Sequence, residues 1–360
     1  MIERTQQKRR LCVSPQNIVH SKRGGSFMGD QDKSFKKFVT QNAIYIVLVM
    51  LIIVIAIIDP RFLSFTCFKD ILIQSSTKVI IALGISLILI TGGTDLSAGR
   101  VVGLSAVLSA SMLQTADYGR RFFPNMPQLP LWLPILIAIL AGLLFGLING
   151  VIISKLNVPP FIATLGTQVI VLGANSIYFN LPPNSSQPIG GLRKDFTNLG
   201  SGGIFSIHYI LIIAIIVSII MWIVFNKTRL GKNTFAIGGN REAARVSGIN
   251  VERTLIAVYA IAGALYGLAG VLEAARTGGA TNNYGTMYEL DAIAACVVGG
   301  VSTSGGIGSV PGVLVGVLIF GVINYGLTFI GVNPYWQQII KGMIIISAVA
   351  FDIRKYISKK

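Results

Sequence analysis

Long apolar runs recur along nearly the whole of this 360-residue chain, and they constrain its fold more than any other feature. Hydrophobic residues make up 52% of the sequence and charged residues 12%, against roughly 25% charged residues in a soluble domain. Runs of this kind are typical of membrane-spanning helices. A closed β-barrel would instead alternate polarity over short segments. We therefore expect an all-α, polytopic membrane protein.

The apolar runs predict a bundle of about ten transmembrane helices. They lie at residues 43–58, 71–91, 99–115, 131–153, 161–182, 208–225, 254–275, 289–306, 312–330 and 335–351. The run at 289–306 is the weakest, because two acidic residues and a Gly/Ser cluster interrupt it. No small-residue cleavage site follows the first run, so we expect a retained span and not a signal peptide.

Basic residues concentrate in three polar segments, and this placement predicts the orientation of the chain. The net charge is +16, and the basic segments are residues 1–37, the loop 226–253 and the C-terminus. The positive-inside rule places all three in the cytoplasm, which agrees with ten spans and with both termini inside. We expect a disordered tail over 1–37 and a permease domain over 38–360. Orientation explains this charge, so no nucleic-acid partner is expected.

The loop 226–253 is polar where lipid-facing sequence would otherwise be expected. Asn240 is a favoured N-cap, Glu242 lies in the first turn, and Gly248 suits the residue that ends a helix. These signals predict a helix of about two turns. So short a helix is marginal alone in water. It therefore docks either on its own bundle or in a groove on a cytoplasmic partner.

Glu242-Ala243-Ala244 followed by Gly248 resembles the EAA…G loop of permease subunits of bacterial ABC importers. Further matches to sugar permeases of the ribose and galactose type are Thr91-Gly92-Gly93-Thr94-Asp95-Leu96-Ser97-Ala98-Gly99, Pro160-Phe161-Ile162-Ala163-Thr164-Leu165-Gly166 and Ala236-Ile237-Gly238-Gly239-Asn240. Residues 280–283, 288–296 and 330–337 resemble the galactose/methyl-galactoside permeases most. The resemblance covers about residues 38–357, and the basic N-terminal extension departs from it.

This resemblance implies a multi-pass subunit of the bacterial inner membrane that carries a monosaccharide, galactose or methyl-galactoside. A cytoplasmic ATP-binding subunit would receive the loop at Asn240, Glu242, Ala243, Ala244 and Gly248 and would supply all ATP hydrolysis. A periplasmic sugar-binding protein would deliver the substrate, and two copies of the chain would form a homodimer in the lipid. The chain has no G-x-x-x-x-G-K-[ST] motif, so we expect no nucleotide site of its own. It has no zinc-spaced His/Cys set and no Ser/His/Asp constellation, so we expect no bound metal, no other cofactor and no enzyme activity.

The segment Gly92-Gly93-Thr94-Asp95-Leu96-Ser97 is polar but lies among the expected spans. A carboxylate in the bilayer costs roughly 2.5–3.5 kcal/mol on insertion scales, so Asp95 should face the bundle interior or water. The glycines indicate a helix break that lines a cavity. Two alternatives stay open: Asp95, with Thr94 and Ser97, binds sugar hydroxyls in a translocation pathway, or Asp95 pairs with Arg100 and only orients helices.

A second polar group crowds the outer end of two expected spans, namely Asn282, Asn283, Glu289 and Asp291. These side chains line the pathway or receive the binding protein, and helix capping is the alternative. Glu273 and Arg276 are three residues apart and are expected to pair structurally. Lys78 and Lys341 are expected to snorkel or to pair with an acid.

A faint internal repeat is also visible. Gly146-Leu147-Ile148-Asn149 and Gly321-Val322-Ile323-Asn324 are each followed by a proline ten residues after the Asn. Thr-Gly-Gly precedes each unit, at 91–93 and 277–279. On the expected topology the two units are inverted, a recurrent plan of transporters; chance similarity is the alternative.

Two rival functions remain at this point. One is an ion-driven secondary sugar transporter, whose uptake would follow the membrane potential and survive loss of the ATPase. The other is a membrane-embedded transferase, which would need clustered catalytic carboxylates or histidines. Only Glu289 and Asp291 come near such a cluster.

Overall fold

The computed structural model describes residue 46 and residues 48–357, except for residues 51 and 206. The chain divides into two units, Met1–Val47 and Leu48–Lys360, and the described residues belong almost wholly to the second. The predicted basic tail, 1–37, lies outside the described residues.

The second unit is built almost entirely from helices. In chain order the elements are η1 (Pro60–Leu63), α2 (Phe65–Ile90), α3 (Ala98–Met112), α4 (Trp132–Lys155), α5 (Pro160–Phe179), α6 (Lys194–Ser201), β1 (Gly203–Ile204), β2 (Ile207–His208), α7 (Tyr209–Lys227), α8 (Arg229–Gly239), α9 (Arg241–Val246), α10 (Val251–Thr277), α11 (Tyr288–Val298), α12 (Val310–Phe329) and α13 (Pro334–Ile357). β1 and β2 pair antiparallel and form a two-stranded hairpin.

Six helices of the described residues are long and apolar enough to cross a membrane: α2, α4, α5, α7, α10 and α12. Each coincides with a predicted span. A shorter apolar run, Leu48–Ile58, coincides with the first predicted span, and α13 with the last. Two predicted spans are shorter than expected. α3 has 15 residues, and α11 has 11. The 11 residues of α11 rise about 16 Å, whereas the hydrocarbon core of a membrane is ~30 Å thick.

The break after α11 has a local cause. Gly299 ends the helix, and Gly300 adopts a left-handed conformation with φ of 85°, which glycine reaches without steric cost. The predicted span at 289–306 is therefore a short helix followed by the irregular segment 299–309.

α2 and α10 form the interior of the bundle, with 78% and 61% of their most apolar windows buried. α10 packs against α2, α3, α4 and α6. Its approach to α4 is close because glycines lie in the contact: a Cβ on Gly142 would overlap the Gly263 carbonyl oxygen, and one on Gly146 would overlap the Tyr259 carbonyl oxygen. Small residues of this kind are typical of helix contacts within membranes. α4, α5 and α7 keep apolar outer faces, with only 28%, 28% and 33% of their windows buried, as lipid contact requires.

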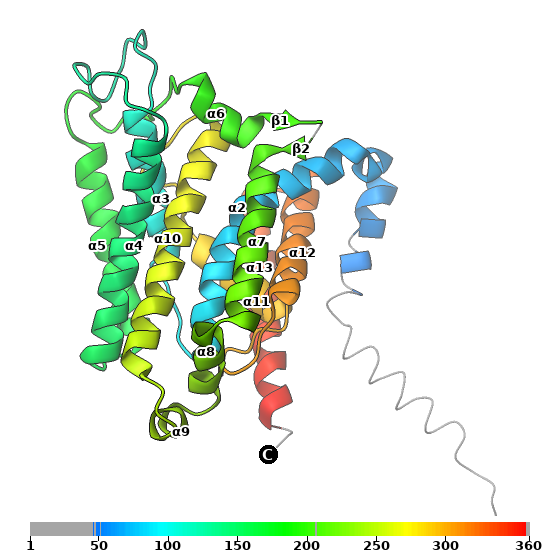
Figure 1. The fold of residues 1–360 in the computed structure, drawn as a ribbon. Helices are drawn as coiled ribbons and strands as arrows, with labels where there is room; N and C mark the ends of the chain where they lie inside the picture. Colours follow the sequence, from blue (N-terminus) through cyan, green and yellow to red (C-terminus); the bar gives the residue numbers. More distant parts are fainter. Residues whose placement is uncertain (1–45, 47, 51, 206, 358–360) are drawn as a thin grey trace, which may run out of the picture. The chain divides into compact units, whose positions relative to one another are not determined.

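Connecting elements collect at the two ends of the helices (Figure 1). α6 and the β1–β2 hairpin lie at one end, which we call the α6 end. α8, α9 and the C-terminus of α13 lie at the other, which we call the α8–α9 end. This separation sets the frame for the two candidate sites.

Candidate coupling segment and translocation pathway

α9 has the boundaries that its capping residues predict. The Asn240 side chain accepts a hydrogen bond from the Ala243 amide at 2.9 Å, and Glu242 lies in the first turn. Gly248 has φ of 83°, and the next amide, that of Ile249, returns to the Ala244 carbonyl at 3.1 Å. This is the glycine-ended stop expected from the sequence.

One face of α9 packs against the neighbouring helices of this chain, and the other face is exposed. Ala244 is buried in a small apolar cluster with Ile237 of α8 and Leu255 of α10. Glu242 and Val246 point outward, and Val246 is 88% exposed. The helix therefore packs on its own bundle through Ala244, and its acidic and apolar face is exposed; docking of that face on a cytoplasmic partner stays a prediction.

The Glu242 carboxylate pairs with Arg245 at 3.2 Å, but their side chains are 73% and 53% exposed. An exposed pair of this type contributes ~1 kcal/mol or less to stability. It therefore contributes little to holding the helix together. Ala243 is also exposed.

α8 was not predicted from the sequence. Its N-cap is Thr228, whose hydroxyl accepts a hydrogen bond from the Gly231 amide at 3.1 Å. Thr234 and Ile237, three residues apart, are buried on one face. Thr228 is the signal in the sequence that could have predicted this helix, because threonine is a favoured N-cap.

The C-terminal end of α8 packs directly on the end of α2. A Cβ on Gly238 would overlap the Ile90 carbonyl oxygen, so only glycine fits there without a shift. The same carbonyl accepts a hydrogen bond from the Gly306 amide at 2.9 Å. Gly305 in turn lies against Gly238 and Gly92. α8 is thus joined to the first residues of the polar segment after α2.

That segment, residues 91–97, folds back into the bundle. Asp95 is 1% exposed, and its Oδ1 accepts hydrogen bonds from the Ser97 amide at 2.9 Å and the Ser97 hydroxyl at 2.6 Å. The Thr94 carbonyl accepts from the Tyr259 hydroxyl at 3.3 Å. Gly92 has φ of 79°, and Gly93 lies close to the same tyrosine hydroxyl. The predicted helix break is present, and its lining of a cavity stays a prediction.

A buried hydrogen-bond chain links Asp95 to two further helices. The Asn149 amide of α4 donates to the Ser97 hydroxyl at 3.0 Å, and Thr167 of α5 donates to the Asn149 side-chain oxygen at 2.6 Å. The Leu96 amide donates to the Thr164 hydroxyl at 3.2 Å. Sequence reasoning missed the role of these α4 and α5 residues, although Asn149 ends the repeated Gly-Leu-Ile-Asn and Thr164 lies in a family motif.

The alternative ion pair between Asp95 and Arg100 is not formed. Arg100 donates to the Thr286 hydroxyl at 3.1 Å. Asp95 takes part in none of the ion pairs found among the described residues. Its buried carboxylate is held by hydroxyl and amide donors.

The loop 278–287 and the start of α11 pack on α3. A Cβ on Gly99 would overlap both the Gly285 carbonyl oxygen and the Glu289 carboxylate. Glu289 is 6% exposed, and its Oε2 has no hydrogen-bond partner. The first turns of α3 and α11 are therefore in direct contact inside the bundle.

The other predicted residues have different surroundings. Asn282 contacts α5, where its amide reaches the Ser176 hydroxyl at 3.5 Å. Asn283 is exposed. Asp291 lies between two lysines, 3.2 Å from the Lys341 ammonium and 3.6 Å from that of Lys78. The structure thus brings Asp95, Ser97 and Glu289 to the first turns of α3 and α11, whereas Asp291 pairs with α2 and α13.

The predicted structural pair on α10 is confirmed. Arg276 and Glu273 lie 2.7 Å apart, and the Glu273 side chain is 4% exposed. Thr77 and Tyr288 each donate a further hydrogen bond to Glu273 at 3.0 Å. These bonds tie α10 to α2 and α11. Lys78 and Lys341 also pair with an acid, one of the two outcomes expected for them.

Comparison with known proteins agrees with these features. A family model described as the branched-chain amino acid transport system permease component matches residues 67–349. The galactose/methyl galactoside import permease protein MglC of Haemophilus influenzae is 56% identical over 92% of this chain and 99% of that protein. MglC of Escherichia coli is 54% identical over 91% and 98%. The ribose import permease protein RbsC of Bacillus subtilis is 39% identical over 86% and 91%. No solved structure gives a match.

The family match spans most of the described helices, from α2 to α13. The relatives align over nearly their entire length, so the similarity is not confined to the α9 motif. The resemblance to importer permeases drawn from the sequence is therefore confirmed. The chain belongs to the family of branched-chain amino acid transport system permease components.

Proposed function

We propose that this chain is the membrane permease subunit of an ABC importer that carries galactose or methyl galactoside. The observation that carries the proposal is the 56% identity to a galactose/methyl galactoside import permease over 99% of that protein. A ribose permease aligns almost as completely but is only 39% identical, which favours the galactose class.

In this proposal a cytoplasmic ATP-binding subunit hydrolyses ATP, and α9 is where its movement enters the permease. The open face of α9, with Glu242 and Val246, would seat on that subunit. Asn240 and Gly248 fix the ends of the helix, and Ala244 attaches it to α8 and α10. A rigid connection of this kind transmits work only if the partner binds the two states of the permease differently.

The packing at the α8–α9 end indicates how a movement of α9 would reach the interior of the bundle. α8 contacts Ile90 and the segment 305–306 through Gly238, and Gly305 touches Gly92. A displacement of α8 would therefore shift the start of the Gly92–Ser97 segment. Asp95 and Ser97 occupy the other end of that segment, at the first turn of α3.

We propose that the polar groups around the starts of α3 and α11 contribute to the translocation pathway. They are Gly92, Gly93, Thr94, Asp95, Ser97, Asn282, Asn283, Glu289 and Asp291. The unpartnered Glu289 oxygen and the Asp95 carboxylate would accept hydrogen bonds from sugar hydroxyls. The binding protein would set most of the sugar specificity, so weak contacts suffice here.

We also propose that α2–α5 and α10–α13 are inverted repeats. α2 and α10 have 26 and 27 residues, and Thr-Gly-Gly closes each of them. A short helix follows in both units, and α5 and α13 both begin at a proline. On this plan both termini and α9 are cytoplasmic. Labelling of Ser247→Cys and Ser201→Cys, each as the sole cysteine, from either side of the membrane would test which side α9 faces.

The remaining parts of the proposal concern assembly. The chain would form a homodimer in the inner membrane, with a periplasmic sugar-binding protein docking at the α6 end. Purification of the tagged chain in mild detergent should recover the ATP-binding subunit, and mass measurement of that complex should give two permease copies. A complex with one permease copy would contradict the homodimer.

Uptake in proteoliposomes tests the function itself. Vesicles that hold the complete complex should accumulate labelled galactose when ATP is inside and the binding protein outside. Replacing ATP with a non-hydrolysable analogue should abolish uptake, and an ionophore that collapses the membrane potential should leave it unchanged. Uptake that persists without hydrolysis and stops with the ionophore would establish the rival ion-driven mechanism.

A further inference from the structure

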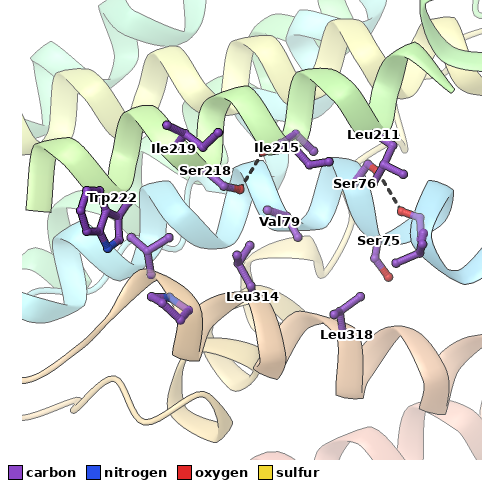
Figure 2. A pocket seen from close by; sticks show the side chains of 14 residues that line it. Ser75, Ser76, Val79, Leu211, Ile215, Ser218, Ile219, Trp222, Leu314 and Leu318 are labelled. Atoms are coloured by element: carbon purple, nitrogen blue, oxygen red, sulfur yellow. Dashed lines mark hydrogen bonds between the residues drawn. The ribbon is translucent and has the colours of Figure 1, made fainter. Parts of the chain in front are cut away.

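An apolar groove lies between α2, α7 and α12, away from the segments discussed above (Figure 2). Its cavity volume is about 500 Å³. Along α7 its lining runs from Leu211 to Trp222, about 16 Å at 1.5 Å per residue. This length is roughly the depth of one leaflet of a ~30 Å hydrocarbon core.

The groove lining offers almost no polar group to a ligand. The Ser218 and Ser76 hydroxyls donate to carbonyl oxygens of their own helices, at 2.7 and 2.8 Å (Figure 2). Ser75 lies against Gly321 of α12. Ile215 and Ile219 on the rim are 50% and 54% exposed. Helices of this length and polarity meet hydrocarbon on such a face, so among the described residues the groove is open to a hydrocarbon chain.

The groove has room for an extended hydrocarbon chain. Its cavity of about 500 Å³ extends over about 16 Å of α7 and is lined almost wholly by apolar side chains. An acyl chain has no polar group that such a lining would leave unsatisfied. The lining therefore favours a lipid tail over a polar ligand.

Charge distinguishes the two ends of the groove. At the α8–α9 end the Lys227 ammonium lies 5.8 Å from the centre of the Trp222 ring, and Arg229 follows on α8. A tryptophan beside basic residues is typical of a helix end at the membrane surface. At the opposite end Lys69 is accompanied by Asp70, so the charge there is balanced.

We infer that this groove binds one acyl chain of an anionic phospholipid, whose phosphate lies near Lys227. The chain would lie along α7 beneath Ile215 and Ile219, and the headgroup phosphate would meet the Lys227 ammonium. Each Lys or Arg near a membrane surface favours an anionic lipid by a factor of about five. The site does not depend on which sugar the protein carries.

Trp222 is a natural reporter of groove occupancy, because the chain has only three tryptophans. Trp132→Phe and Trp336→Phe together leave Trp222 as the sole fluorophore. The full-length variant is reconstituted in phosphatidylcholine vesicles that contain increasing fractions of phosphatidylglycerol brominated on its acyl chain. Brominated phosphatidylcholine in parallel vesicles is the zwitterionic comparison.

We expect half-maximal quenching of Trp222 at an about five-fold lower fraction of the brominated anionic lipid. Lys227→Gln should abolish that preference, and Ser218→Phe should reduce quenching by filling the groove, while Ser218→Ala should not. A matched control retains only Trp132, which is 63% exposed on α4 and lies outside the groove. Both lipids should quench it equally.

Three results would overturn the inference. Equal quenching of Trp222 by both lipids would show ordinary boundary lipid only. No quenching of Trp222 by either lipid, with Trp132 quenched, would show that protein covers the groove. A preference that survives Lys227→Gln would remove the assigned headgroup contact; this exposed side chain can be changed without disturbing the core, so the test stands even if Ser218→Phe fails to fold.

Discussion

Replacing Asp291 with asparagine should destabilise the permease, because this carboxylate neutralises two lysines inside the bundle. Its Oδ2 lies 3.2 Å from the Lys341 ammonium and 3.6 Å from that of Lys78. The three side chains are only 12%, 24% and 25% exposed. The interaction joins α11 to α2 and α13.

The size of the effect follows from these distances. At an effective dielectric constant of ~20, each pair has a Coulomb energy of about 5 kcal/mol before any desolvation is counted. Removing one partner of a buried ion pair costs about 3–5 kcal/mol, since the other charge stays buried and unpaired. Both lysines retain some contact with solvent, so we expect about 2–3 kcal/mol for Asp291→Asn. This corresponds to a fall in Tm of about 5 °C.

The assay is a thermal denaturation of the purified complex, followed by the loss of its monodisperse gel-filtration peak. Lys341→Met added to Asp291→Asn removes one unpaired ammonium, so at least half of the lost Tm should return. Glu242→Gln is the control, because its ion pair with Arg245 is exposed and should shift Tm by less than about 1 °C.

An Asp291→Asn complex with unchanged Tm would refute this reasoning. If that variant also lost uptake, Asp291 would belong to the sugar pathway, as the sequence predicts. A fall in Tm that Lys341→Met does not relieve would equally contradict the charge argument. Uptake measured on the same preparation therefore separates a structural carboxylate from a pathway carboxylate.

Three further changes test coupling and the pathway. Glu242→Lys reverses charge on the open face of α9 and should cut uptake at least ten-fold while ATP hydrolysis continues; wild-type uptake would rule out that contact. Asp95→Asn keeps an acceptor for the Ser97 donors, so it should leave Tm within about 2 °C but lower galactose uptake; unchanged uptake at normal expression would make Asp95 structural. Gly238→Val places side-chain atoms on the Ile90 carbonyl and should reduce both Tm and uptake. Gly239→Ala, with open space around it, is its control and should change neither.

Local signals in the sequence were enough to predict the long helices and α9. The six long spans follow from hydropathy, because they are apolar along their length: α4, α5 and α7 meet lipid, and α2 and α10 are buried among other apolar helices. α9 follows from Asn240 and Gly248, whose side chain and backbone satisfy groups only a few residues away. These features need no knowledge of the tertiary structure.

The polar core could not be predicted because its partners are far apart in the chain. Ser97 meets Asn149 from a different helix, and Thr167 comes from a third. A buried amide is satisfied only by the donors that the fold brings to it. No spacing in the sequence indicates that the Asn149 side chain donates to one hydroxyl, that of Ser97, and accepts from another, that of Thr167.

The shortness of α3 and α11 explains how two carboxylates remain inside this bundle without an ion pair. Asp95 lies just before α3, and Glu289 lies in the first turn of α11. The N-terminus of a helix carries about half a positive charge, and in partly buried sites it stabilises an acid by up to ~2 kcal/mol. That offsets much of the roughly 2.5–3.5 kcal/mol that a carboxylate costs within the membrane. A helix that crosses the whole bilayer has its N-terminus at the surface, so only a broken helix can offer this stabilisation in the interior. Replacing Gly92 and Gly93 with helix-forming residues would extend α2 through this break and should therefore remove the helix N-terminus that makes Asp95 tolerable.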